Sequence, residues 1–158
     1  MELLQIFDKN ENIILKKIQR GIEPNNNEYI MIVYVFIVCD NKILLELNTK
    51  YNKWVIPGGH VISDNPKEDI KRECMEELNI NIDINNLCEI TTLINNNRLF
   101  KLYYIKCNKE FDNIVLQKEE VSDYNYFEIN KISDMINNEL IRENNIIFFD
   151  EFFKYYNK

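Results

Sequence analysis

Residues 58–80 read GGHVISDNPKEDIKRECMEELNI and contain two glycines, a short acidic loop and a predicted helix. Asn65 can cap this helix, Pro66 suits its first position, and Glu68 completes a capping box three residues after the cap. Asn79 predicts its end, because asparagine tolerates the left-handed backbone conformation next best after glycine. The stretch therefore predicts a helix from Pro66 to about Asn79, entered from a glycine turn.

One face of this helix is acidic. At about 100° per residue, Glu73, Glu76 and Glu77 fall within one arc, beside an apolar stripe that faces the core. Like charges at this spacing cost about 0.2–0.5 kcal/mol per pair, and the helix dipole disfavours anions near the C-terminus. A solvated acidic face is the usual explanation of such a pattern. The glycine pair and the Arg72–Glu73 pair favour instead a site for Mg²⁺ or Mn²⁺, which prefer oxygen ligands.

The same residues resemble the signature of the Nudix hydrolases. That signature is Gly, five residues, Glu, seven residues, then Arg-Glu-apolar-any-Glu-Glu-any-Gly-apolar. The segment RECMEELNI at 72–80 matches its second half, except that Asn79 replaces the glycine. In the first half, Asp64 stands at the Glu position. Gly58 has the formal spacing, whereas aligning the Gly-Gly pair leaves the loop one residue short, so the glycine of the signature is Gly58 or Gly59.

The resemblance implies a metal-dependent enzyme that hydrolyses the diphosphate bond of a nucleoside diphosphate linked to another moiety. In such a site, Arg72 fixes a carboxylate by a forked ion pair. Either Glu73 or Glu120, which precedes the last predicted strand, takes the proton of the attacking water. The implied cofactor is Mg²⁺ or Mn²⁺, and its implied ligands are Glu73, Glu76, Glu77 and the backbone carbonyl of Gly59.

Four residues are candidates for substrate binding. His60 is the only histidine and follows the glycine pair, although a lone histidine is more often a packed residue than a ligand. Arg98 and Lys101 are the nearest basic candidates for a second phosphate, and Tyr103 can stack on a base. Each of the last three is explained equally well as an ordinary strand residue.

The rest of the chain predicts strands on either side of the marked helix. The apolar run 28–39 is too continuous to alternate, which predicts a central strand buried on both faces. We expect an α+β fold of the Nudix type, an α/β/α sandwich with a mixed sheet, in a single domain 1–158. An N-terminal hairpin (1–23), similar to that of the isopentenyl-diphosphate isomerase-like branch, precedes a core at 28–158. The other expected elements are strands at 42–48, 87–95, 98–107 and 124–127, and helices at 131–137 and 146–156.

Composition narrows the classes of partner and compartment. A net charge of −7 argues against a nucleic-acid binder, so we expect a small nucleotide-like diphosphate as substrate. The longest apolar run is about half the length of a transmembrane helix, and no signal peptide is visible, so no membrane partner is expected. The four cysteines lack metal-site spacing. We interpret Cys39, Cys74, Cys88 and Cys107 as reduced core residues of a cytoplasmic protein, with a homodimer as one possible assembly.

Two alternative functions remain. A catalytically silent Nudix domain that binds a nucleotide as a regulator is the main one, although such domains usually lose a signature carboxylate and this chain keeps all three. Isopentenyl-diphosphate isomerase is the other. That enzyme needs a catalytic cysteine beside a histidine in a strand-edge motif, whereas Cys39 is followed by Asp-Asn-Lys and the only histidine is His60.

Overall fold

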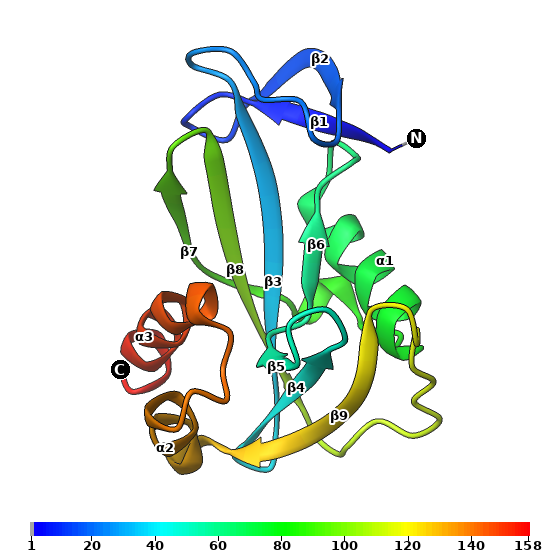
Figure 1. Ribbon diagram of the computed structural model, residues 1–158, viewed down its shortest axis with the longest axis vertical. Helices are drawn as coiled ribbons and strands as arrows, with labels where there is room; N and C mark the ends of the chain where they lie inside the picture. Colours follow the sequence, from blue (N-terminus) through cyan, green and yellow to red (C-terminus); the bar gives the residue numbers. More distant parts are fainter. Residues whose placement is uncertain (1) are drawn as a thin grey trace.

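The computed structural model describes residues 2–158, which contain one sheet of nine strands (Figure 1). The strands are β1 (Leu3–Phe7), β2 (Ile13–Gln19), β3 (Tyr29–Cys39), β4 (Lys42–Asn48), β5 (Lys53–Val55), β6 (Gly58–His60), β7 (Cys88–Asn95), β8 (Arg98–Cys107) and β9 (Val121–Glu128). β3 is central: it pairs antiparallel with β1, β4 and β6, and in parallel with β8. The mixed sheet that the sequence predicts is confirmed.

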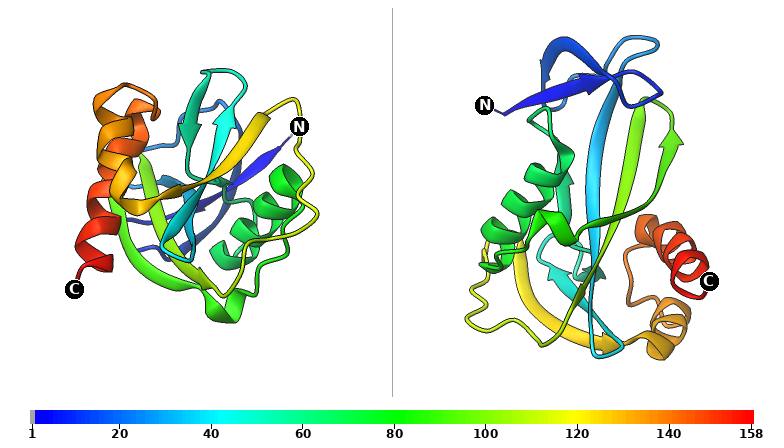
Figure 2. Two further views of the ribbon diagram at one scale, coloured as in Figure 1. Left: turned by 90° about the horizontal axis from the view of Figure 1, so that it is seen from below. Right: turned by 180° about the vertical axis from the view of Figure 1, so that it is seen from behind.

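Helices lie on both sides of this sheet (Figure 2). The α-helices are α1 (Pro66–Leu78), α2 (Ile132–Asn137) and α3 (Ile146–Tyr156), and short 3₁₀ segments are η1 (Ile84–Asn86), η2 (Ile129–Lys131) and η3 (Glu143–Asn145). α1 packs on one side, and α2 and α3 pack on the other. The expected α/β/α sandwich is therefore confirmed.

The side chains of β3 alternate between the two sides. Val33 and Val35 pack in the core that contains Cys74 of α1, whereas Phe36 packs in the core that contains Phe152 of α3. The rings of Phe36 and Phe152 are stacked with centroids 4.4 Å apart. Because successive strand residues point to opposite faces, a strand covered on both sides needs an unbroken apolar run. This explains the composition of residues 28–39.

α1 begins and ends where the sequence predicts. The side chain of Asn65 accepts a hydrogen bond from the backbone N–H of Lys67 (3.2 Å). The predicted capping box is wrong in one detail, since the N–H of Asn65 donates to Ser63 Oγ (3.1 Å) and not to Glu68. At the other end, Asn79 is left-handed (φ 58°, ψ 35°), the conformation that glycine or asparagine adopts at a helix end. Asn79 can therefore replace the signature glycine without disturbing the helix.

Two expectations need correction. The Gly-Gly segment is not a turn but the short strand β6, antiparallel to β3, with Gly59 opposite Val33. Of the four cysteines, Cys39 and Cys74 are buried as expected, but Cys107 is only half-buried and Cys88 is exposed at the start of β7. All four are free thiols. No helix within residues 2–158 is long and apolar enough to cross a membrane.

Candidate functional site

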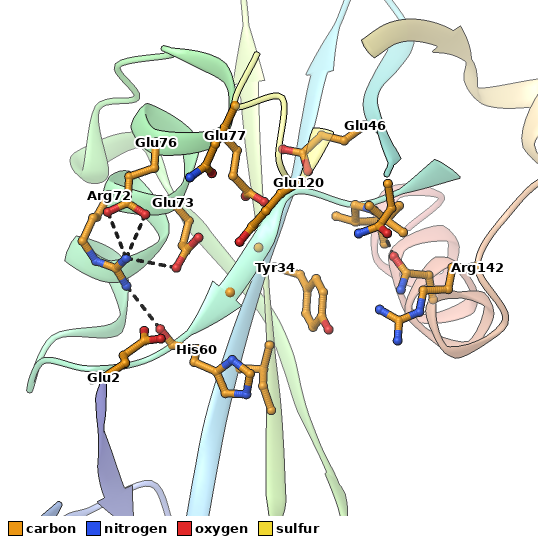
Figure 3. A pocket seen from close by; sticks show the side chains of 18 of the residues that line it. Glu2, Tyr34, Glu46, His60, Arg72, Glu73, Glu76, Glu77, Glu120 and Arg142 are labelled. Carbon is orange, nitrogen blue, oxygen red and sulfur yellow. Dashed lines mark hydrogen bonds and ion pairs between the residues drawn. The ribbon is translucent and has the colours of Figure 1, made fainter. Parts of the chain in front are cut away.

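Arg72 ties the acidic face of α1 to β6 (Figure 3). Its Nη1 donates to Glu73 Oε1 (3.0 Å) and to the carboxylate of Glu76 (3.3 Å). Its Nη2 donates to Asp69 Oδ1 (3.2 Å) and to the backbone carbonyl of His60 (3.3 Å). One guanidinium thus fixes three carboxylates of the helix relative to the neighbouring strand. Each carboxylate is contacted by a single guanidinium nitrogen, and the expected forked pair with one carboxylate is not formed.

Gly59 lets the carboxylate of Glu73 approach the backbone of β6. A Cβ atom at position 59 would lie 2.3 Å from Glu73 Cδ, so any side chain there would displace that carboxyl group. Gly58 is needed for a different reason, since a Cβ at position 58 would lie 2.2 Å from the carbonyl oxygen of Val33. Of the two glycines, Gly59 is therefore the one against which Glu73 packs.

Glu46 of β4 is a buried acid that the sequence analysis missed. Glu46 is 2% exposed, and its Oε1 has no hydrogen-bond partner within residues 2–158. Glu77 of α1 is 6% exposed, and its Oε1 also lacks a partner in this part of the chain. Both side chains point into one pocket together with Glu73 and Glu120 (Figure 3). The signal was present in the sequence, because an acid in the apolar strand KILLELN is buried at high cost unless something offsets its charge.

Burial and mutual repulsion make these groups reluctant to ionise. Burial raises the pKa of Glu46 to about 8, with the charges of Glu73 and Glu120 adding to the effect. Burial likewise raises the pKa of Glu73 to about 7, against the opposing attraction of Arg72. The pKa of Glu77 is raised well above its usual range by burial and then by the neighbouring carboxylates. The cluster therefore retains protons near neutral pH, which is how crowded buried carboxyls avoid an uncompensated charge.

The donor set fits a hard divalent cation. All the candidate ligands are oxygen atoms, and the two buried oxygens without partners gain one when a cation enters. Within residues 2–158, no three acidic, histidine or cysteine side chains are already grouped closely enough to hold an ion. The side chains of Glu73 and Glu76 are instead drawn toward Arg72. Ion binding therefore requires small side-chain rotations within the pocket.

The acid cluster makes the stability of the metal-free protein depend on pH. A carboxyl whose pKa is higher in the folded than in the unfolded protein favours folding most at low pH and loses that contribution as the pH rises through its folded pKa. We therefore expect the melting temperature in EDTA to fall between about pH 5 and pH 8, because these carboxyls ionise near pH 4.5 in the unfolded chain, whereas the folded pKa values of Glu73 and Glu46 lie at about 7 and 8. Glu46→Gln should flatten this fall, whereas Glu68→Gln, at an exposed position of α1, should not. A profile that is flat or rises with pH in the wild type would contradict the burial of the cluster.

Most of the predicted site residues meet in this pocket, which has a volume of about 260 Å³. Arg98 instead lines a second chamber of about 540 Å³, which shares several lining residues with the first, His60 among them. The predicted residues that line the first pocket are Gly59, His60, Arg72, Glu73, Glu76, Glu77 and Glu120.

The structure does not bring Lys101 and Tyr103 to this pocket. They lie in a separate pocket of about 400 Å³, where Lys101 forms ion pairs with Glu11 (2.6 Å) and Glu89 (3.3 Å). Side chains of a strand alternate between its faces, so Arg98 and Lys101, three positions apart in β8, point to opposite sides of the sheet. Tyr103 lies on the side of Lys101 and is 1% exposed.

Three further pocket residues come from segments that the sequence analysis did not connect to the site. Tyr34 lies on β3, Arg142 directly precedes η3, and Arg20 follows β2. Burial raises the pKa of Tyr34 to about 12, against the opposing charge of Arg142. Their convergence depends on the sheet topology, which no local sequence pattern encodes.

Comparison with known proteins gives one family. The model of the NUDIX domain matches residues 28–150 of the chain. No curated protein matches it at a significant level.

The similar solved structures have low sequence identity and show the fold alone. DR0079 from Deinococcus radiodurans has a TM-score of 0.70 at 14% identity, covering 92% of this chain and 94% of that one. The NUDIX domain of Shewanella oneidensis NrtR, in complex with ADP ribose, has a TM-score of 0.64 at 14% identity, with 84% and 88% covered. The MutT protein from Methanosarcina mazei Go1 has a TM-score of 0.63 at 23% identity, with 82% and 96% covered.

Proposed function

The chain belongs to the Nudix family, and we propose that it hydrolyses the diphosphate bond of a small nucleotide-like molecule with Mg²⁺ or Mn²⁺ as cofactor. The observation that carries this proposal is the pair of buried, partnerless carboxylate oxygens of Glu46 and Glu77, beside the Arg72-bound Glu73. Such a pair is destabilising unless a cation or shared protons offset its charge. We infer that a bound cation offsets it when the carboxyls lose their protons.

Glu73, Glu76 and Glu77 would hold the ion, together with the carbonyl of Gly59 that the family resemblance implies. Glu46 adds a fourth carboxylate, supplied by β4 and not by the signature helix. When bound, the ion neutralises charge on the phosphoryl oxygens and orients the diphosphate for in-line attack by water. The remaining roles fall to the side chains, and Arg72 holds Glu73 in place.

We propose Glu120 as the general base. Its side chain extends into the pocket from the segment between β8 and β9, and it has no ion-pair or hydrogen-bond partner within residues 2–158 (Figure 3). Glu73, by contrast, is held by Arg72 at 3.0 Å, which suits a fixed ligand. Glu120→Gln should lower kcat by about 10²–10⁴-fold, the usual contribution of general base catalysis, with little change in metal affinity. Glu73→Gln should lower both kcat and the affinity for the metal ion. If instead Glu120→Gln weakened metal binding and Glu73→Gln lowered only kcat, Glu73 would be the base and Glu120 the ligand.

A substrate panel tests the proposed function. Nucleotide sugars, dinucleotides, nucleoside triphosphates and coenzyme A derivatives would be incubated with the protein and Mg²⁺ at alkaline pH, because the pKa values of Glu73 and Glu46 lie at about 7 and 8. We expect phosphorylated products of diphosphate cleavage from at least one substrate, and no such products in EDTA. A wild-type protein that is folded, binds the metal ion and is inert across the panel would contradict hydrolysis.

Such an inert protein would favour the alternative function of a nucleotide-binding regulator. The NUDIX domain of Shewanella oneidensis NrtR was crystallised with ADP ribose, so binding of a nucleotide-like ligand has a precedent in a similar fold. Saturable binding of a panel member without turnover would distinguish the two functions.

A further inference from the structure

The glutamate pocket continues into a second chamber of opposite character. The two cavities share seven lining residues and therefore adjoin each other. Toward the outer end, the lining becomes cationic and aromatic. Its cations are Arg20, Lys50, Arg98 and Arg142, and its aromatic side chains are Tyr34, Tyr51 and Phe100. Two carboxylates, Glu119 and Glu120, also line it. Four cations against two carboxylates give the chamber a positive balance, whereas the whole chain has a net charge of −7.

Arg142 is the best-placed of these cations. Its guanidinium carbon lies 3.9 Å from the ring centroid of Tyr51, and its backbone N–H donates to the carbonyl of Trp54 (3.0 Å). It forms no ion pair with a carboxylate within residues 2–158. Stacking fixes the plane of a guanidinium while leaving the N–H groups at its edge free to donate. The guanidinium of Arg142 thus faces the pocket near Tyr34, and its N–H groups have no acceptor within residues 2–158 (Figure 3).

The other cations differ in how far they are neutralised. Lys50 is exposed, lies 5.2 Å from the Tyr51 centroid and has no carboxylate partner among the described residues. Arg98 is paired with Glu23 through two hydrogen bonds (2.9 and 3.2 Å), and Arg20 with Glu2 (3.3 Å). The cations without a carboxylate partner among the described residues are therefore Lys50 and Arg142, and both lie against the ring of Tyr51.

We propose that the chamber around Tyr51 and Arg142 is a phosphate-binding subsite, and that the substrates of this protein carry a phosphate group outside the diphosphate that is hydrolysed. This inference rests on the proposed function for the position of the hydrolysed bond, but the subsite itself does not depend on hydrolysis. The planar fork of Arg142 matches a phosphate in a bidentate geometry, and Lys50 adds a second positive charge. The aromatic wall suits the planar or apolar part of a substrate that joins the two phosphate positions.

The subsite is tested first without metal, so that the result is independent of catalysis. Binding of adenosine 5′-monophosphate and of adenosine would be measured by NMR titration in EDTA at low salt. We expect the monophosphate to bind at least about tenfold more tightly, since hydrogen bonds between charged groups contribute more than neutral ones. Arg142→Met should remove this difference, and Arg142→Lys should restore part of it. Lys109→Met, which removes an equal charge from an exposed loop outside both chambers, should leave it unchanged.

The second test places the phosphate relative to the hydrolysed bond. Coenzyme A and dephospho-coenzyme A differ by one phosphate remote from the diphosphate, and their Kd values would be measured with Mg²⁺ in the Glu120→Gln protein to avoid turnover. We expect coenzyme A to bind about tenfold more tightly, and Arg142→Met in this background to equalise the pair. Three results would each overturn the proposal. They are equal affinities for adenosine and its monophosphate, an Arg142→Met variant that keeps the wild-type difference between these two ligands, and equal affinities for coenzyme A and dephospho-coenzyme A. A wild-type protein that prefers the phosphorylated ligands but hydrolyses no substrate would overturn only the proposed function.

Discussion

Glu77→Gln is expected to lower kcat by about 10³-fold or more on any substrate that the wild type hydrolyses. Glu77 is the most deeply buried of the three signature glutamates, and one of its oxygens has no partner within residues 2–158. Replacing an anionic ligand by a neutral amide removes charge where the ion must be held, and a 10³-fold loss corresponds to about 4 kcal/mol of transition-state stabilisation. Steady-state kinetics of the wild type and of Glu77→Gln, with Mg²⁺ and with Mn²⁺, would measure this decrease in kcat.

The same substitution should raise the stability of the metal-free protein above pH 8. Glutamine cannot ionise, so the repulsion between positions 46 and 77 disappears. This combination of lost activity and increased stability excludes unfolding as the cause. Glu68→Gln, an exposed position in the first turn of the same helix, is the matched control and should change neither property appreciably. A Glu77→Gln protein with wild-type activity would exclude Glu77 as a ligand.

Gly59→Ala is expected to lower kcat by about 10²-fold with only a small loss of stability. The added Cβ would lie 2.3 Å from Glu73 Cδ, so the carboxyl group must move. This movement affects the flexible end of a side chain and leaves the pairing of Gly59 with Val33 intact, so folding changes little. Displacement of a catalytic group by about 1 Å can reduce the rate by 10²-fold.

A double variant separates this cause from general damage to β6. Glu73→Asp shortens the side chain and alone should impair activity. In combination with Gly59→Ala, however, the shorter side chain avoids the added methyl group. The two changes should therefore cost less together than the product of their separate effects. Strictly multiplicative losses would show that the glycine acts through something other than its contact with Glu73.

Local signals in the sequence were sufficient for the elements that carry the fold. α1 was predicted from its cap and proline, and its end from Asn79. β3 followed from an unbroken apolar run, because a strand covered on both faces has no polar alternation. β6 was missed, since two adjacent glycines disfavour a strand on propensity alone and only the pairing with β3 makes them extended.

Spacing along the sequence is sufficient only for the site residues of α1, whereas Gly59 and Glu120, which also line the pocket, are expected there from the family resemblance. The spacing of Glu73 and Glu77 indicated a shared face, which the structure bears out. Glu46 and Arg142 come from distant segments, and their approach to the helix is set by the order of strands in the sheet. Lys101 does not share a site with Arg98, because the two-residue period of a strand places them on opposite faces of the sheet.

Calorimetric titration of Mn²⁺ into the metal-free protein near pH 8 tests the central claim most directly, because the claim is that a cation offsets the charge of the buried glutamates. We expect saturable binding to the wild type, weakened about tenfold or more in Glu77→Gln and unchanged in Glu68→Gln. The absence of binding to the folded wild-type protein, or equal affinity in Glu77→Gln, would contradict the account.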